Sequence, residues 1–377
     1  MKALEHVDDK GVALEVKGLR VVFHTYAGDV KALDGVELAI RRGEIFGLVG
    51  ESGCGKSVTA LSIAGLLPEN AEIVSGEVWL DGHDLLKRGK DEMRLVRLKE
   101  IALVFQDPMT YLNPVISIGS QITETLTGDV SVYKDDLIDS RIGEIGAAQN
   151  IGNENFDALL IEKENLRKLK ASSKLSKRQA KRLAKFRALE YLRLLRLPEP
   201  ERVFKMYPFE LSGGMRQRAM IAMALVRRPK VLLADEITTA LDVAVQAQIL
   251  ELLKELRDKI DAAIILITHD LAVVSEVCDR VAVMYAGNIV EVAEVHELFT
   301  NPLHPYTKGL MGALPRPDKS SMKLESIRGS VPDLIFPPTG CRFHPRCPMA
   351  FERCPQVKPP LLEVTPGHKV ACFLYGG

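Results

Sequence analysis

A glycine-rich segment, GESGCGKS from Gly50 to Ser57, has the residue types that bind phosphate. It matches the pattern G-x-x-x-x-G-K-[ST], and it lies between an apolar run typical of a strand and a run with helical spacing. Glycines let the backbone wrap closely, so that successive N–H groups point at phosphate oxygens, and a helix N-terminus adds positive partial charge. We therefore expect Lys56 to contact the β- and γ-phosphates of a nucleotide and Ser57 to bind Mg²⁺.

Two adjacent carboxylates follow a second apolar run, in VLLADE. Asp235 ends the predicted strand, where it is well placed to hold Mg²⁺ through water. Glu236 follows it and is able to polarise an attacking water molecule. By itself the pair is equally typical of a strand that ends in a solvated turn, so its interpretation depends on the phosphate-binding loop.

Four of the six cysteines lie near the C-terminus, as Cys341, Cys347, Cys354 and Cys372, with 5, 6 and 17 residues between them. In a reducing compartment such a group more often holds a metal than forms disulfides. Four thiolates suit a tetrahedral zinc or an iron–sulfur cluster. Because no pair is as close as a C-x₂-C knuckle, the spacing is easier to reconcile with a [4Fe–4S] cube, with zinc as the alternative.

Elements that would position these residues are recognisable from their hydrophobic periodicity. The runs over residues 13–25, 36–40 and 44–50 predict an antiparallel sheet that leads into a buried strand, and residues 75–85 predict a further hairpin. From Val231 onward, strands and helices alternate, which indicates a parallel α/β core.

Two segments stand apart from this pattern. Residues 163–196 carry 13 Lys or Arg against two Glu and are expected to be helical. A solvated basic helix face is the favoured interpretation. Contact with anionic lipid is the second, and nucleic-acid binding ranks last because few aromatic residues are interleaved. From Asn301 prolines become frequent, which marks a linker and a small extension. We expect a main domain over 1–300, with a basic helical insertion at about 128–197, and an extension over 301–377.

The composition indicates a globular protein, but its balanced charge does not indicate a particular binding partner. The 377 residues are 46% hydrophobic, enough for a substantial core, and 50 basic residues balance 50 acidic ones. The first residues lack the pattern of a signal peptide, and no run of about 18 apolar residues occurs. We expect a soluble protein of the cytosol.

Further motifs give these elements a family resemblance. Gln106 lies in VFQDPM, LSGGMRQR begins at Leu211, TTALD ends at Asp242, and His269 follows an apolar run in ILITHD. With the phosphate-binding loop and VLLADE, their order resembles that of ATP-binding cassette (ABC) ATPases over roughly residues 12–300. The resemblance implies an α/β P-loop fold with an antiparallel β subdomain and a helical subdomain. One departure is Ile237, where the family usually has proline, and it removes no chemical group.

The resemblance also implies a role for each motif. Two cassettes would meet head to tail, with ATP between the loop of one and the LSGGM segment of the other. Glu236, His269 and Gln106 would be catalytic, and Asp242 would lie in the dimer-contact loop. Mg²⁺ would be bound by Ser57, Gln106 and Asp235. Tyr26 is favoured to stack on adenine, with Phe23 as its rival. The expected ATP contacts are Tyr26, Gly50, Glu51, Ser52, Gly53, Cys54, Gly55, Lys56, Ser57 and Val58, and across the dimer Leu211, Ser212, Gly213, Gly214 and Met215.

The tail is similar to that of ATPases from dipeptide and oligopeptide importers, in NPLHPYTKGL and in the cysteine segment. This branch implies a [4Fe–4S] cluster, a sibling ATPase, two transmembrane permease subunits and, indirectly, an extracytoplasmic solute-binding protein. The chain would then lie on the cytoplasmic face of the membrane as a peripheral subunit, with no nucleic-acid partner. Import of oligosaccharides or nickel by the same machinery is an alternative. A non-transport ABC ATPase acting on nucleic acid is the alternative from another class.

Overall fold

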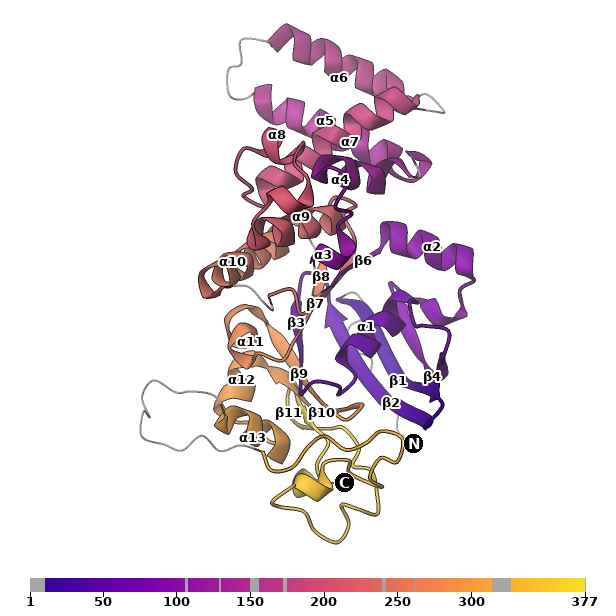
Figure 1. The fold of residues 1–377 in the computed structure, drawn as a ribbon, viewed down its shortest axis with the longest axis vertical. Coiled ribbons are helices and arrows are strands. Elements are labelled where there is room, and N and C mark those ends of the chain that lie inside the picture. The colour runs from indigo at the N-terminus through magenta and orange to yellow at the C-terminus, as the bar shows by residue number, and fades with distance from the viewer. Residues whose placement is uncertain are drawn as a thin grey trace. The chain divides into compact units, whose positions relative to one another are not determined.

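The computed structural model describes residues 11–105, 108–128, 130–149, 156–171, 175–238, 242–260, 262–313 and 327–376. These residues form two compact units (Figure 1). The first unit contains the chain up to Leu103, residues 230–237 and the chain from Leu250 onward. The second contains residues 104–229 and 238–249. The boundary that we expect at residue 300 is not one of these divisions, and it stays a prediction.

An antiparallel sheet of four strands begins the first unit, in the order β2-β1-β4-β5. Along β1, buried Leu14, Val16, Leu19 and Val21 face the core, with a register shift around Gly18. The alternation of apolar and polar residues therefore produces one buried face, as the sequence predicts. The four strands are β1 (Val12–Thr25), β2 (Gly28–Arg41), β4 (Ala71–Leu80) and β5 (His83–Asp84).

A sheet of eight strands forms the rest of this core, in the order β11-β12-β10-β9-β3-β8-β7-β6. The strands β9, β3, β8 and β7 run parallel to one another and are buried along almost their whole length, as strands covered on both faces must be. Their carboxyl ends meet at one edge, where ligands bind in open α/β sheets. The bounds are β3 (Ile45–Val49), β6 (Ile101–Val104), β7 (Val231–Asp235), β8 (Ala263–Thr268) and β9 (Arg280–Tyr285).

The C-terminal segment continues this sheet. β10 (Asn288–Glu294) pairs with β9, β12 (His368–Val370) pairs with β10, and β11 (Leu362–Thr365) pairs with β12, all antiparallel. Figure 1 shows this yellow segment beside β10. The helices of this unit are α1 (Lys56–Ala64), α2 (Lys90–Lys99), α11 (Leu271–Val277), α12 (Val295–Thr300) and α13 (Pro305–Gly312).

Helices make up the second unit, and the basic segment is among them. Several of its cations pair with carboxylates of other helices, so part of the positive charge of the segment is neutralised within this unit. Lys170 lies 2.7 Å from Asp139, and Arg187 is buried against Asp136. The helices are α3 (Pro108–Tyr111), α4 (Ile118–Thr127), α5 (Val130–Gln149), α6 (Phe156–Ala171), α7 (Lys177–Leu194), α8 (Pro200–Val203), α9 (Gly213–Leu225) and the first residues of α10 (Val243–Ile260).

The antiparallel sheet, the parallel α/β core and the helical character of the described part of residues 163–196 are thus confirmed. Among the described residues, none of the helices combines the length and the apolar character that a membrane span requires.

Candidate nucleotide site and cysteine cluster

The phosphate-binding loop connects β3 to α1, and its glycines are required by close contacts. Gly55 has a φ of 110°, and a β-carbon placed on it would lie 2.7 Å from Leu33 Cδ2. A β-carbon on Gly50 would lie 2.1 Å from the carbonyl oxygen of Met284. Only glycine fits at these two positions, and the tight path leaves the first N–H groups of α1 at the open end of the loop.

Lys56 is held inside this loop. Its ammonium donates to the carbonyl oxygens of Gly50 and Glu51, over 2.8 and 3.1 Å, and the residue is 6% exposed. Backbone carbonyls therefore hold the charge that we expect to contact phosphate. The thiol of Cys54 lies 3.8 Å from the same ammonium, and burial raises its pKa.

Asp235 is the last residue of β7, and its carboxylate is poorly satisfied. Its Oδ1 atom is buried and has no hydrogen-bond partner within the described part of the chain. Burial raises the pKa of Asp235 and the charge of Glu236 raises it further, although a hydrogen bond with Ser57 and the charge of Lys56 lower it. A buried carboxylate oxygen without a partner, beside a hydroxyl, is a donor set that fits Mg²⁺.

Glu236 and His269 lie together next to this carboxylate. The backbone N–H of Glu236 donates to the carbonyl of Ile267 over 2.9 Å, which fixes the turn after β7 to strand β8. His269 follows the end of β8, and its Nδ1 atom lies 3.2 Å from Glu236 Oε1. The structure thus brings Lys56, Ser57, Asp235, Glu236 and His269 to one edge of the sheet, as expected from parallel strands.

The LSGGM segment lies in the helical unit, at the start of α9. Ser212 caps this helix, because its Oγ accepts from Met215 N over 3.3 Å. A β-carbon on Gly214 would lie 2.4 Å from Val245 Cγ1, so close packing of α9 on α10 requires glycine here. Asp242 is exposed before α10 and accepts from Val245 N over 2.9 Å.

Other expected contacts have different outcomes. Gln106 lies outside the described residues. Tyr26 lies in the turn between β1 and β2 and is fully exposed, whereas Phe23 packs against the core. These surroundings favour Tyr26 over Phe23 for stacking, but its contact with adenine stays a prediction.

Arg346 contacts the loop and was not predicted from the sequence. It donates to both carboxylate oxygens of Glu51, over 2.7 and 3.1 Å, and to the hydroxyl of Tyr285 over 3.3 Å. The hydroxyl of Tyr306 accepts from the backbone N–H of Glu51 over 3.0 Å. Glu51 of the loop is therefore held by side chains from the C-terminal part of the chain. Glu51 and Arg346 are 295 positions apart, so no local pattern indicates this contact.

Cys341, Cys347, Cys354 and Cys372 all line one small cavity of about 20 Å³, and all are free thiols. Burial raises the pKa of Cys341 to about 11, and the charges of the other three contribute to the rise. Cys347 and Cys372 are affected in the same way by their neighbours. Across the described ranges, no group of three or more His, Cys, Asp or Glu is arranged to hold a single metal ion. The four thiols therefore line one cavity, but their arrangement is not that of a site for a single metal ion.

Two families of known proteins match parts of this chain. A profile described as "ABC transporter" matches residues 33–239, and one described as "Oligopeptide/dipeptide transporter, C-terminal region" matches residues 290–354. The dipeptide transport ATP-binding protein DppD of Bacillus subtilis is 43% identical over 362 residues, 96% of this chain and 94% of DppD. The oligopeptide transport ATP-binding protein OppD of Escherichia coli is 42% identical over 360 residues, 96% of this chain and 92% of OppD.

Solved structures agree with the fold. The dimeric post-hydrolysis state of the ATP-binding cassette MJ0796, bound to ADP and Pi, matches 75% of this chain and 98% of the cassette, at 25% identity and a TM-score of 0.55. The P-loop fold and the carboxylates at the sheet edge define a nucleotide-hydrolysing cassette. The chain belongs to the ABC transporter family. It is an ABC-type ATPase, and its C-terminal region is that of oligopeptide and dipeptide transporters.

Proposed function

We propose that this ATPase drives the import of dipeptides or oligopeptides, as a peripheral subunit on the cytoplasmic face of the membrane. The observation that carries the proposal is the joint presence of Lys56, Glu236 and His269 at one phosphate-binding edge and the C-terminal region shared with DppD and OppD. Oligosaccharides and nickel are the alternative cargoes, because an ABC ATPase does not itself contact the cargo.

In this proposal each side chain at the sheet edge has a separate role in ATP hydrolysis. Lys56 leaves its two carbonyl partners to contact the β- and γ-phosphates. Glu236 accepts a proton from the attacking water, while His269 holds the Glu236 carboxylate in place and contacts the γ-phosphate. Asp235, Ser57 and Gln106 would hold Mg²⁺, which supplies positive charge between the phosphates.

We further propose that the site is completed by a second, sibling cassette. The N-terminus of α9 would present the N–H groups of Ser212, Gly213 and Gly214 to the γ-phosphate bound by the sibling. Two permease subunits would dock on the helical unit. A groove there supports this, since Met206, Tyr207 and Phe209 line it and Phe209 is 64% exposed. An extracytoplasmic solute-binding protein would deliver the peptide.

The four cysteines are proposed to bind a [4Fe–4S] cluster with a structural role. Support comes from four free thiols around one cavity. Burial and neighbouring thiols raise the pKa of Cys341, Cys347 and Cys372, which raises the cost of forming thiolates there. Positive metal centres would remove that cost. A single zinc needs all four sulfurs at about 2.3 Å from one point, which makes zinc the alternative rather than the first choice.

The function is tested on the whole transporter in proteoliposomes. The chain is purified with its sibling ATPase and permeases, and the solute-binding protein is added outside. We expect di- or oligopeptides to accelerate ATP hydrolysis and to accumulate inside, and a complex carrying Glu236→Gln in this chain to accumulate much less. Stimulation by an oligosaccharide or by nickel, with none by peptides, would replace the proposed cargo. Hydrolysis that no solute stimulates but nucleic acid does would replace the class.

A further inference from the structure

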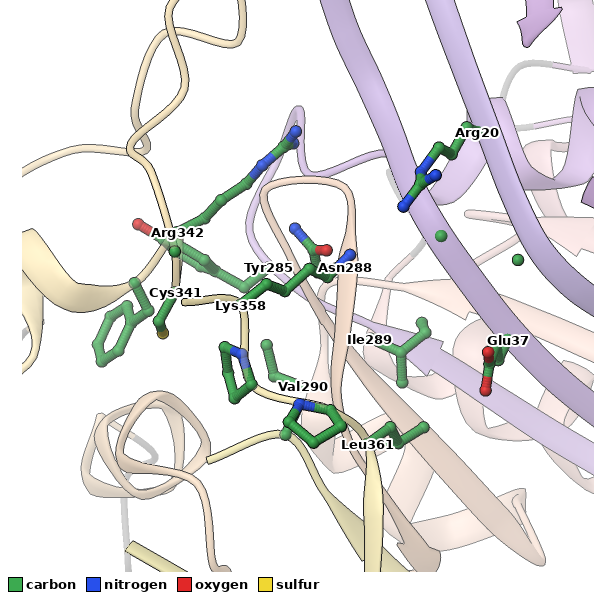
Figure 2. A pocket seen from close by; sticks show the side chains of 17 residues that line it. Arg20, Glu37, Tyr285, Asn288, Ile289, Val290, Cys341, Arg342, Lys358 and Leu361 are labelled. Carbon is green, nitrogen blue, oxygen red and sulfur yellow. The ribbon is translucent and has the colours of Figure 1, made fainter. Parts of the chain in front are cut away.

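A second cavity, of about 410 Å³, lies in the first unit and contains none of the phosphate-loop residues 50–57. Its walls come from three parts of the chain (Figure 2). Arg20 and Glu37 belong to β1 and β2, Ile289 and Val290 to β10, and Lys358 to the C-terminal segment. The volume lies within the range of small-molecule sites in proteins, about 300–1,000 Å³. Cys341 and Phe343 line both this cavity and the small cavity of the cysteine cluster, but Cys347, Cys354 and Cys372 do not line this one.

Three cations of this region converge on one carboxylate. Arg20 Nε lies 3.1 Å from Asp34 Oδ1, while Lys358 Nζ and Arg342 Nη2 lie 3.1 and 3.7 Å from Asp34 Oδ2. Glu37, which lines the cavity, is the second carboxylate of this region. Three positive charges against two negative ones leave one positive charge over, which a monovalent anion would balance.

The two more exposed cations face the same space. Gly35 has a φ of 76°, and a β-carbon placed on it would lie 3.5 Å from Lys358 Nζ and 3.9 Å from Arg20 Nη2. The bare backbone of Gly35 therefore leaves room between the two nitrogens for an anionic group. Burial lowers the pKa of Lys358, Asp34 raises it, and the charges of Arg342 and Arg20 lower it further. An anion in this space would relieve that repulsion.

An acceptor and an apolar surface complete the walls. Asn288 Oδ1 is buried and has no hydrogen-bond partner in the described portion of the chain, while its amide donates to the carbonyl of Ala286 over 3.2 Å. A buried acceptor of this kind requires a donor. Ile289, Val290 and Leu361 supply apolar surface to the same cavity. The cavity therefore combines an excess positive charge, an unsatisfied acceptor and apolar walls.

We propose that this cavity is a binding site for a small carboxylate that carries an apolar side chain and an N–H donor. The carboxylate lies over Gly35 between Arg20 and Lys358, the N–H donates to Asn288 Oδ1, and the side chain packs on Ile289, Val290 and Leu361. The single excess charge favours a carboxylate over a doubly charged phosphate. The carboxyl end of an apolar peptide and an N-acyl amino acid both have this chemistry. The proposal does not depend on the transported cargo.

The test uses three probes on the full chain saturated with ADP and Mg²⁺, followed by calorimetry and saturation-transfer NMR. N-acetyl-leucine has all three features, N-acetyl-leucinamide lacks the charge, and 4-methylpentanoate lacks the N–H. For about a dozen heavy atoms we expect N-acetyl-leucine to bind with a Kd of about 1 mM. Both other probes should bind more weakly, the amide by about tenfold or more.

Two variants and a control locate the binding. Lys358→Gln should weaken N-acetyl-leucine about tenfold and leave the amide unchanged. Asn288→Ala should remove the advantage of N-acetyl-leucine over 4-methylpentanoate. Lys87→Gln, an exposed lysine paired with Asp84 away from the cavity, should change nothing. The proposal is overturned if no probe binds saturably, if acid and amide bind equally, or if folded Lys358→Gln binds the acid as well as the parent does.

Discussion

At the scale of single residues, the backbone of Glu236 is under strain. Its φ of 49° lies in the left-handed region, which costs a residue with a side chain on the order of 1–3 kcal/mol unless its surroundings hold it there. Here the hydrogen bond from its N–H to Ile267 holds the turn, and the carboxylate reaches His269. The left-handed turn thus places the carboxylate at the sheet edge beside the phosphate-binding loop, which agrees with the proposed role in activating water.

Replacing this carboxylate separates binding from hydrolysis. Glu236→Gln keeps the size and a hydrogen bond to His269 but cannot accept a proton, so turnover should fall by about two or more orders of magnitude. ATP affinity, measured with a fluorescent nucleotide, should be retained. The assay uses the complex with the sibling's site disabled, and Glu276→Gln, an exposed carboxylate near Lys254, serves as control. Near-normal hydrolysis by the Glu236 variant would exclude Glu236 as the base.

At the scale of elements, the C-terminal segment and the phosphate loop are joined by one ion pair. The Arg346 side chain is only 7% exposed, and its two-pronged contact with Glu51 has the geometry of a strong charge-assisted bond. Arg346 directly precedes Cys347, so the cysteine cluster and the nucleotide site are linked through two adjacent residues. We infer that Arg346 positions the loop before nucleotide arrives.

A positioning role predicts a change in KM rather than in kcat. Arg346→Ala should raise the KM for ATP by about tenfold, because the loop must then be ordered at the expense of binding energy, while kcat changes little. Arg346→Lys keeps the charge but not the fork, so it should rescue only part of the loss. Iron or zinc content is measured alongside. An unchanged KM, or a loss of metal that accompanies every effect, would contradict the positioning role.

Sequence patterns predicted the parts of this site that are local. The loop at Gly50–Ser57, the carboxylates after β7 and His269 after β8 each follow an apolar run, and parallel pairing of the strands brings them together. The pairing of β12 with β10 was not predicted, because a strand of three residues in a proline-rich segment has too little pattern. Arg346 was missed for a related reason. Its contact with Glu51 depends on how the C-terminal segment packs against the loop, and no residue spacing in the sequence predicts that packing.

At the scale of the whole molecule, the tail is tied to the core by a buried carboxylate. Glu291 of β10 is fully buried and accepts from Leu303 N, His304 N and His368 Nε2, over 2.7, 2.9 and 2.8 Å. Burial lowers the pKa of His368, but its hydrogen bond to Glu291 and its charge interactions with Glu291 and Glu297 outweigh this and raise the pKa overall.

Stability should therefore depend on pH through His368. The raised pKa means that the protonated imidazole stabilises the fold, fully below the ordinary value of about 6.5, and that this contribution is lost as pH rises through the raised value. Thermal melts from pH 6 to pH 9, at roughly 2–4 °C per kcal/mol, should show a fall in Tm over this window. His368→Gln should flatten the dependence. A Tm of the parent that does not fall above pH 6.5 would disprove the link.

Metal binding by the four cysteines would stabilise the tail in addition to its hydrogen bonds with Glu291. An extension with little core of its own gains stability from such a crosslink, in which the metal replaces the thiol protons and joins the four segments. Protein purified without oxygen should be brown and contain about four irons per chain. Cys347→Ser should bleach it and lower its Tm. Cys278→Ser, at a thiol that does not line the cluster cavity, should leave the colour and the iron content unchanged. Colourless protein with one zinc per chain would mean that the four cysteines bind zinc instead of an iron–sulfur cluster. Metal-free protein, together with an unchanged Tm in Cys347→Ser, would show that the cysteines form no metal crosslink.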